Sequence, residues 1–186
     1  DPDIIVLEEA TPAVIDAILA NRRYYVSYDE GTVPILSKAP PLSTHVERPD
    51  RWWPWPPMSR ASFPAPGGAF DVVGVHYTWP TTPVQKRQGE IFAQTLKQFP
   101  KERLIVAGDF NSAPWSFSRQ REDRMFGLER RTRALFSWPA ERFGPMPFIA
   151  NATTVASGKA ATSAPTRSSV ARSTCSAAEA IESGSA

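Results

Sequence analysis

The chain has 186 residues, of which 41% are hydrophobic, so it is long enough for one domain with a substantial core. Its 21 Lys and Arg residues nearly balance 19 Asp and Glu, which argues against a strongly basic face for nucleic acid. The single Cys175 excludes an internal disulfide framework and a cysteine-rich metal site. No apolar run reaches the length of a membrane-spanning helix, so we expect the chain as given to be soluble.

The first predicted elements are a strand over residues 3–7 and a helix over residues 11–23. DIIVL is a nearly continuous apolar run, which is typical of a strand covered on both faces. Thr11 is the candidate N-cap of the helix, and Pro12 suits its first position. The apolar face predicted for this helix consists of Ala13, Val14, Ala17 and Ile18.

The next region is rich in proline. Apolar segments at 32–37 and 60–65 predict two strands joined by a long loop, in which Pro54, Pro56 and Pro57 exclude regular structure. The tryptophans of RWWPWPP (51–57) leave two interpretations open. Their rings either cover the edge of the core or form a rim that faces a substrate or a membrane interface.

A strand, a helix and a second strand are predicted over residues 70–78, 82–100 and 103–110, an order typical of an α/β fold. Thr82 and Gln85 match a capping box, with Pro83 between them, and Pro100 stops the helix. The predicted apolar face comprises Val84, Ile91, Phe92, Leu96 and Phe99.

The composition changes abruptly near the end of the chain. All 20 aromatic residues lie at or before Phe148, and 23 of the last 36 residues are Ser, Ala or Thr. Such a segment has little apolar volume to bury. We therefore predict a domain over residues 1–149 and a tail over residues 150–186 that is disordered or read out of frame. A natural truncated copy is the alternative.

Polar residues stand at the carboxyl ends of the three strongest strand candidates, where open α/β sheets build their sites. They are Glu9, His76, and Asp109 with Asn111. Each has an ordinary structural explanation by itself, as a solvated acid, a core histidine or a pair of turn formers. Their repetition on three strands favours a functional site.

Three motifs, PDIIVLEE, GVHYTWP and IVAGDFNSAPWS, follow one another in this order. The ordered set resembles the endonuclease/exonuclease/phosphatase superfamily, with its DNase I-like fold, in the bacterial branch that carries HxTWP and GDFNxxPWS. The resemblance covers about residues 1–148. It implies a four-layer α/β sandwich, incomplete at both ends, that hydrolyses phosphate esters with Mg²⁺ or Mn²⁺.

The resemblance also implies a role for each site residue. Glu9 would bind the metal, and His76 would donate to a non-bridging phosphate oxygen. Asp109 would orient or deprotonate the attacking water, and Asn111 would hold the phosphate or that water in line. Trp115 and Ser116 would support the loop by packing and capping. The substrate is a phosphate ester, whether in a nucleic acid, a phospholipid headgroup or a small molecule. We expect a monomer without an obligate protein partner.

The family pattern contains elements that this chain lacks. An early strand with an Asn, an Asp-His pair and a final Ser-Asp-His are expected, yet the chain has only His45 and His76. We therefore expect impaired hydrolysis, with a non-catalytic phosphate-binding domain or an inactive truncated copy as alternatives. The localisation stays open, and the parent protein could be membrane-anchored or extracytoplasmic.

Overall fold

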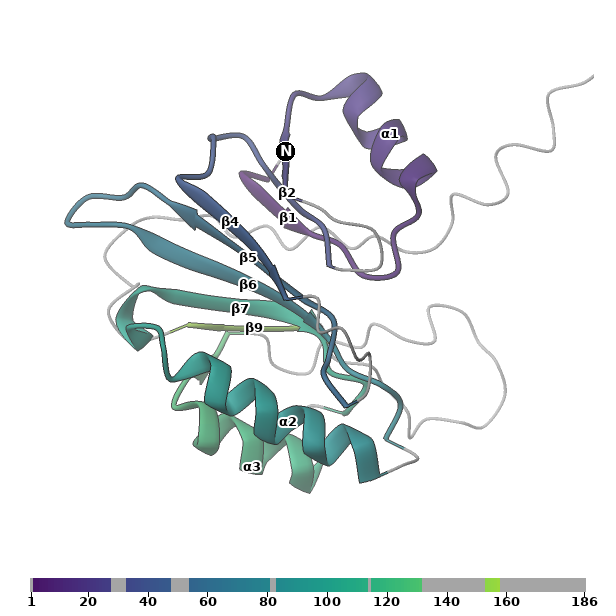
Figure 1. The fold of residues 1–186 in the computed structure, drawn as a ribbon, viewed down its shortest axis with the longest axis vertical. Helices are drawn as coiled ribbons and strands as arrows, with labels where there is room; N and C mark the ends of the chain where they lie inside the picture. The colour runs from purple at the N-terminus through teal and green to yellow at the C-terminus, as the bar shows by residue number, and fades with distance from the viewer. Residues whose placement is uncertain are drawn as a thin grey trace, which may run out of the picture.

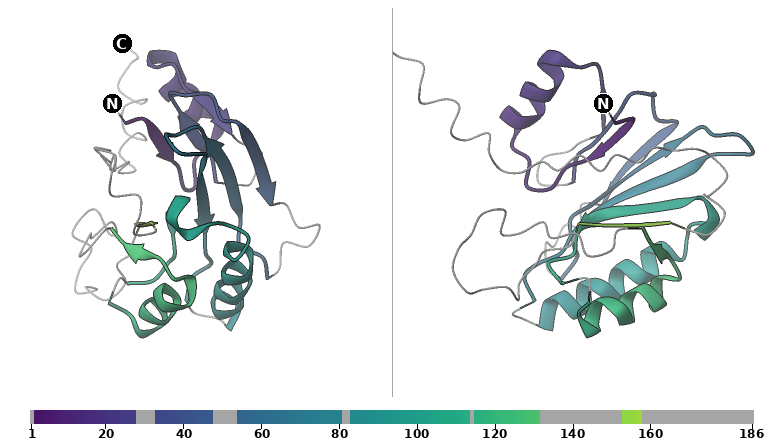
Figure 2. Two further views of the ribbon diagram at one scale, coloured as in Figure 1. Left: turned by 90° about the vertical axis from the view of Figure 1, so that its left-hand side faces the viewer. Right: turned by 180° about the vertical axis from the view of Figure 1, so that it is seen from behind.

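A computed structural model of the chain describes residues 2–27, 33–47, 54–80, 83–113, 115–131 and 153–157. Two sheets lie face to face between outer helices (Figure 1). Helix α1 (Pro12–Asn21) covers the smaller sheet, and helices α2 (Pro83–Leu96) and α3 (Phe117–Phe126) cover the larger one. The view from behind in Figure 2 shows the helices on opposite outer sides. The predicted four-layer α/β sandwich is therefore confirmed.

The smaller sheet contains β1 (Ile4–Val6), β3 (Ile35–Ser37) and β2 (Tyr25–Ser27), in that spatial order. Both pairs are antiparallel. The run at 3–7 therefore belongs to a different sheet from the runs at 70–78 and 103–110. An apolar run shows that a strand is buried, but it does not show which partner the strand pairs with.

The larger sheet has six strands, β4 (Ser43–Glu47), β5 (Met58–Phe63), β6 (Phe70–His76), β7 (Leu104–Asp109), β9 (Thr153–Ser157) and β8 (Glu129–Arg130), in spatial order. Among the described strands, only β6 and β7 pair in parallel, because α2 and a short 3₁₀ turn (Lys101–Arg103) carry the chain back between them. Strand β4 corrects the prediction of a continuous loop between 37 and 60. Strand β9 lies inside the predicted tail, most of which is outside the described residues.

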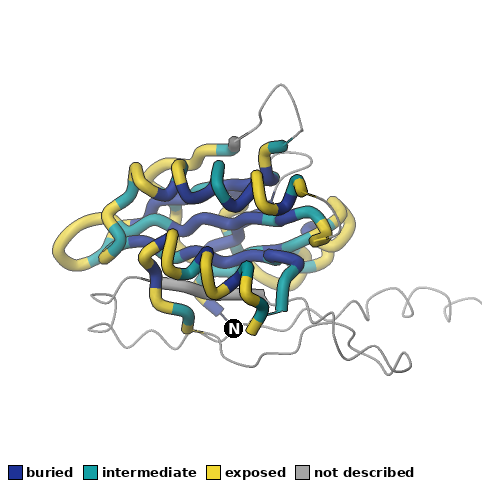
Figure 3. The backbone as a smooth tube through the Cα atoms, turned by 90° about the horizontal axis from the view of Figure 1, so that it is seen from below, coloured by how far each residue is buried: buried dark blue, intermediate teal, exposed yellow. Residues whose placement is uncertain are grey.

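Three apolar clusters fill the three spaces between the four layers. Leu7, Ile15 and Leu36 lie between α1 and the smaller sheet. Ile35, Ala61, Phe63 and Val72 lie between the sheets. The largest cluster lies between the larger sheet and helices α2 and α3, and includes Val73, Val75, Phe92, Leu96, Val106, Phe110 and Phe126. Figure 3 shows these buried strands beneath the exposed outer sides of the helices.

Helix α1 packs with a different face from the predicted one. Ile15 is buried and Ile18 and Leu19 are partly buried, whereas Ala13, Val14 and Ala17 are exposed. Thr11 is the N-cap, as predicted, but its side chain makes no capping hydrogen bond. Packing of Ile15, Ile18 and Leu19 therefore holds the helix on the sheet. The prediction chose another face because small and apolar residues occur on both faces of this helix.

Helix α2 buries Phe92 and Leu96 as predicted and ends at Leu96, before Pro100. Thr82, its predicted cap, lies outside the described residues. Helix α3 was missed, because only two of its ten residues are large aromatic groups and most others are polar. The Ser116 hydroxyl caps it by accepting from the Arg119 N–H at 3.2 Å, and Gly127 ends it with a φ of 64°. No helix among the described residues is long and apolar enough to cross a membrane.

Candidate active site

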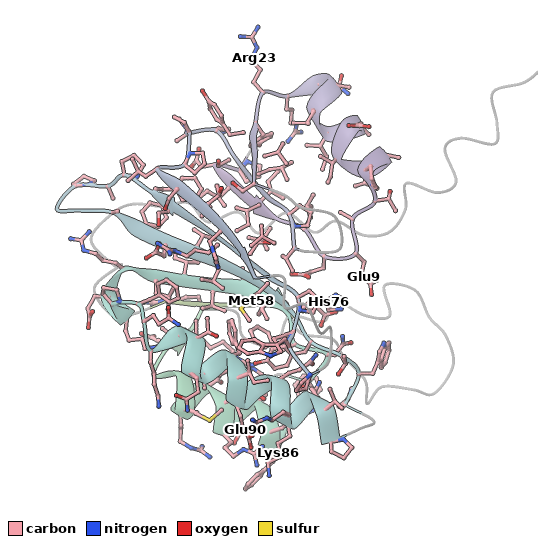
Figure 4. All side chains as sticks on the ribbon, in the orientation of Figure 1. Glu9, Arg23, Met58, His76, Lys86 and Glu90 are labelled. Carbon is pink, nitrogen blue, oxygen red and sulfur yellow. The ribbon has the colours of Figure 1, made fainter. Side chains whose placement is uncertain are left out.

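The candidate site lies at the carboxyl ends of β6 and β7, on the side of the larger sheet that faces the smaller one. His76 and Asp109 are partners in the parallel ladder and therefore project on the same side. Glu9 follows β1 of the smaller sheet, and its side chain points toward His76 (Figure 4). The site is thus built where the ends of the two sheets meet.

The predicted residues converge on His76. The Glu9 Oε1 atom is 3.8 Å from His76 Nε2, and Asn111 Nδ2 is 3.4 Å from the same nitrogen. The Asn111 backbone N–H donates to Asp109 Oδ1 at 2.7 Å. Glu9, His76, Asp109 and Asn111 therefore form one group, although they are separated by up to about a hundred residues in the chain.

Two of these residues have strained backbones. Glu9 has a φ of 52° and Asn111 a φ of 45°, and no other non-glycine residue among those described has a positive φ. Asparagine tolerates this left-handed region, whereas glutamate seldom adopts it. Such strain costs about 1–3 kcal/mol per residue and concentrates at functional sites. The strain marks the same two loops that carry the predicted chemistry.

Asn111 is fixed in one orientation. It is 3% exposed, and its Nδ2 donates to the Tyr77 carbonyl at 2.6 Å. This bond holds the amide so that Oδ1 faces the other way, and Oδ1 is buried without a hydrogen-bond partner. The side chain therefore offers the site an acceptor that nothing in the described part of the chain satisfies.

The site carries a third carboxylate that the sequence did not single out. Both side-chain oxygens of Glu8 are buried and lack hydrogen-bond partners. Burial and the negative charges of Asp109 and Glu9 raise the pKa of Glu8 well above its ordinary value. Burial also raises the pKa of Asp109, opposed by the Asn111 backbone N–H and by His76. The only signal for Glu8 in the sequence was that it stands next to Glu9 at the end of the first apolar run.

The donor set fits a hard divalent cation. Carboxylate and amide oxygens are the ligands that Mg²⁺ prefers, and here the oxygens of Glu8 and Asn111 lack partners. Among the described residues, no group of three or more His, Cys, Asp or Glu side chains is placed so that it could hold a metal ion. Mg²⁺ is usually held by one or two carboxylates, with water and substrate phosphate completing its shell. The carboxylate of Glu9, with the unpartnered oxygens of Glu8 or Asn111, could supply the one or two protein ligands that Mg²⁺ needs.

Helix α2 supports both loops of the site through two buried glutamines. Gln85 Nε2 lies 3.0–3.1 Å from the carbonyl oxygens of Thr78, Phe110 and Asn111. Gln88 Oε1 accepts from the Thr78 N–H at 2.9 Å. Gln85 was predicted to complete a capping box, but its amide instead ties the loop after β6 to the loop after β7.

An arginine on α3 supports the Asp109–Asn111 turn from the other side of the sheet. Arg119 is 0% exposed, and its guanidinium lies 3.7 Å from the centroid of the Phe110 ring. It also binds Glu122 Oε2 at 2.7 Å and Asp123 Oδ1 at 3.0 Å. Because Phe110 stands between Asp109 and Asn111, this buried network anchors the turn that presents both. No local sequence pattern indicates that an arginine here is buried.

The second histidine lies elsewhere. His45 is opposite Arg60 in the register of β4 and β5, on the side of the sheet that faces α2. Together with Arg60, Phe99 and other residues it lines a cavity of about 200 Å³. Glu9, His76 and Asp109 lie on the opposite side of this sheet, so His45 does not complete their group.

Comparison with known proteins identifies relatives of the chain. A sequence model of the Endonuclease/Exonuclease/phosphatase family matches residues 1–169. No curated protein matches the chain in a sequence comparison.

Several solved structures share the fold. TDP2 from D. rerio, complexed with a single-strand DNA product, has a TM-score of 0.57 and 16% identity, covering 85% of this chain and 72% of that one. Sphingomyelinase C from Streptomyces griseocarneus has a TM-score of 0.53 and 21% identity, covering 68% and 57%. A mutant of beta toxin from Staphylococcus aureus with bound magnesium ions has a TM-score of 0.52 and 16% identity, covering 68% and 58%. The chain therefore matches less than two thirds of the length of the latter two proteins, and the likeness shows a shared DNase I-like fold.

Proposed function

From the premise that the chain belongs to the endonuclease/exonuclease/phosphatase family, we propose that it is a metal-dependent hydrolase of phosphate esters. The observation that carries the proposal is the convergence of Glu9, Asp109 and Asn111 around His76 at the junction of the two sheets. A carboxylate, an imidazole, a second carboxylate and an amide gathered at one point can supply the acid–base and electrostatic chemistry of phosphoester hydrolysis.

The acidic residues of the site favour a bound cation. Glu9 and Asp109 place carboxylates where the phosphate ester would bind, and burial raises the pKa of Glu8 and Asp109, which shows that these carboxylates are costly to hold charged without a cation. We assign Glu9 as the residue that holds Mg²⁺ or Mn²⁺. When bound, the cation supplies polarisation of the phosphoryl group and offsets charge on the leaving oxygen.

The other residues act on the substrate and the attacking water. His76 is only partly exposed and would donate an N–H to a non-bridging phosphate oxygen. Asp109 would accept a proton from the water. One N–H of Asn111 Nδ2 is engaged by the Tyr77 carbonyl, and Oδ1 is an unpartnered acceptor. Oδ1 can orient the attacking water and the second N–H can donate to a phosphate oxygen, so we propose that Asn111 holds the water or the phosphate in line.

We further propose that this chain hydrolyses its substrate slowly. His45 and His76 are its only histidines, and His45 faces the other side of the sheet. A second histidine acting in proton transfer would contribute about 10²–10⁴-fold to the rate. A non-catalytic domain that binds a phosphate-bearing ligand is the second candidate, since the unpartnered oxygens support cation binding with or without turnover.

The test is hydrolysis of bis(p-nitrophenyl) phosphate with Mg²⁺ or Mn²⁺, combined with calorimetric titration of Mn²⁺. We expect slow, metal-dependent turnover and measurable binding, both abolished in Glu9→Gln. Glu90→Gln is the matched control, because Glu90 lies on the outer part of α2 and pairs with Arg87 at 3.0 Å. Mn²⁺ binding without turnover would favour the second candidate. Binding that survives in Glu9→Gln would contradict the assignment of the metal.

A further inference from the structure

Four large aromatic side chains are exposed in segments at the end of the sheet that carries the candidate site. Trp55 is 38% exposed, Trp79 44%, Trp115 48% and Phe117 83%. We call these four residues the aromatic rim. Trp55 precedes β5, Trp79 follows β6, and Trp115 and Phe117 lie between β7 and the first turn of α3. All four therefore lie in segments at the edge of the larger sheet that carries His76 and Asp109.

Hydrogen bonds hold these segments beside one another. The His76 N–H donates to the Pro57 carbonyl at 3.0 Å, which joins the segment of Trp55 to the end of β6. The Gln85 amide contacts the carbonyls of both Thr78 and Asn111. These hydrogen bonds therefore hold the segments that carry the rim in fixed positions relative to the ends of β6 and β7.

The rim is difficult to explain as ordinary protein surface. Single exposed apolar residues are common on soluble proteins, but several large ones gathered at one edge mark an interaction surface. Phe92, Phe110 and Phe126 are buried by contrast, although Tyr25 on β2 of the smaller sheet is also 52% exposed. Tryptophan is enriched where one side of a ring is apolar and the other is wet, as at a membrane interface.

Positive charges accompany the rim. Lys86 and Arg121 are exposed and lie within the first two turns of α2 and α3, the two helices that begin at this edge. Figure 4 shows Lys86 projecting away from the body of the protein. Exposed basic residues on helices that begin at the same edge as exposed aromatic rings complement an anionic lipid surface, where each contributes through attraction to the headgroups. The near balance of charge over the chain argues against an extended nucleic-acid track.

We propose that the aromatic rim, with Lys86 and Arg121, docks the protein on an anionic lipid bilayer and so brings phospholipid headgroups to the candidate site. The part that names the substrate rests on the proposed function. The docking itself does not, because it requires neither the metal nor hydrolysis.

The experiment measures sedimentation of the protein with vesicles of phosphatidylcholine, with and without phosphatidylserine, in the presence of EDTA. We expect binding to the anionic vesicles and a blue shift of tryptophan fluorescence. Trp115→Ala with Phe117→Ala should weaken binding at least about tenfold, since two aromatic rings no longer enter the interface. Lys86→Gln with Arg121→Gln should remove most of the preference for anionic vesicles.

Matched controls lie at the opposite edge. Leu42 is 62% exposed and its N–H bonds the Ser62 carbonyl near the far end of β5, so Leu42→Ala should not change vesicle binding. Lys97→Gln, just beyond the other end of α2, is the control for charge. The proposal fails if neither vesicle binds the protein or if rim and control variants bind equally. It also fails if a single-stranded oligonucleotide is bound through the rim while vesicles are not. Vesicle binding without any phosphoesterase activity would sustain the docking and contradict only the proposed function.

Discussion

The replacement Arg119→Met tests the buried network behind the candidate site. The wild-type guanidinium is 0% exposed, pairs with Glu122 and Asp123, and stacks on Phe110. Methionine fills much of the same volume but leaves Glu122 without its partner, while Asp123 keeps its contact with Arg130. Leaving one buried charge unpaired costs about 3–5 kcal/mol. We therefore expect the free energy of unfolding to fall by about this amount at about pH 8.

The pH dependence gives this prediction its specificity. Burial raises the pKa of Glu122 to about 7, and Arg119 partly opposes that rise. Because the folded-state pKa lies above the ordinary value, ionisation of Glu122 weakens the fold. The contribution of Glu122 to the free energy of unfolding is fully present at low pH. It is lost as the pH rises from the ordinary pKa of a glutamate through the folded-state pKa. Without Arg119 this pKa rises further, so the loss of stability in the variant should grow between about pH 5 and about pH 8.

The assay is urea unfolding followed by tryptophan fluorescence at several pH values in that range. The double variant Arg119→Met with Glu122→Gln is the control, because it removes both charges and should recover most of the stability. The reasoning would be refuted by a loss in the single variant that is below about 1 kcal/mol or does not change with pH. Equal losses in the single and double variants would also refute it.

Two further predictions concern the backbone around the site. In Gly108→Ala the new Cβ would overlap the backbone carbonyl of Val75, so we expect a loss of about 3 kcal/mol or more in urea unfolding. Gly127→Ala, where a Cβ meets no atom but φ is 64°, should cost only about 1 kcal/mol, and equal losses would contradict the steric explanation. Ser116→Ala should cost about 1 kcal/mol, because the hydroxyl caps α3. Thr11→Ala should be almost neutral, since Thr11 makes no side-chain cap; a larger effect at Thr11 than at Ser116 would be inconsistent with both assignments.

The arrangement of the layers explains why some elements were predicted well. Strands β6 and β7 lie between the smaller sheet on one side and α2 and α3 on the other, so nearly all their side chains must be apolar. The local sequence shows this requirement as two nearly continuous apolar runs, FDVVGV and LIVAG. Strand β4 was missed because most of its described side chains are exposed, and an edge strand of this kind carries no apolar run.

The residues of the candidate site also divide into those that local sequence predicts and those that it does not. Glu9, His76, Asp109 and Asn111 could be named in advance because a polar residue that ends an apolar strand is a local feature. Glu8 could not, because its importance depends on the burial of its carboxylate near Asp109, a residue far along the chain. Arg119 is a similar case, since nothing in FSRQREDRMF distinguishes the buried arginine from its exposed neighbours.

The sequence by itself determined the α/β class, the strongest strands, the family and the residues that end those strands. These features are written in short-range patterns of apolar residues, turn formers and motifs. Only the tertiary structure decided that β1 joins a separate sheet, that α1 packs through Ile15, and that aromatic rings from three segments stand exposed around one edge. Each of these depends on contacts between residues distant in the chain, and the free energy of such contacts is absent from any local pattern.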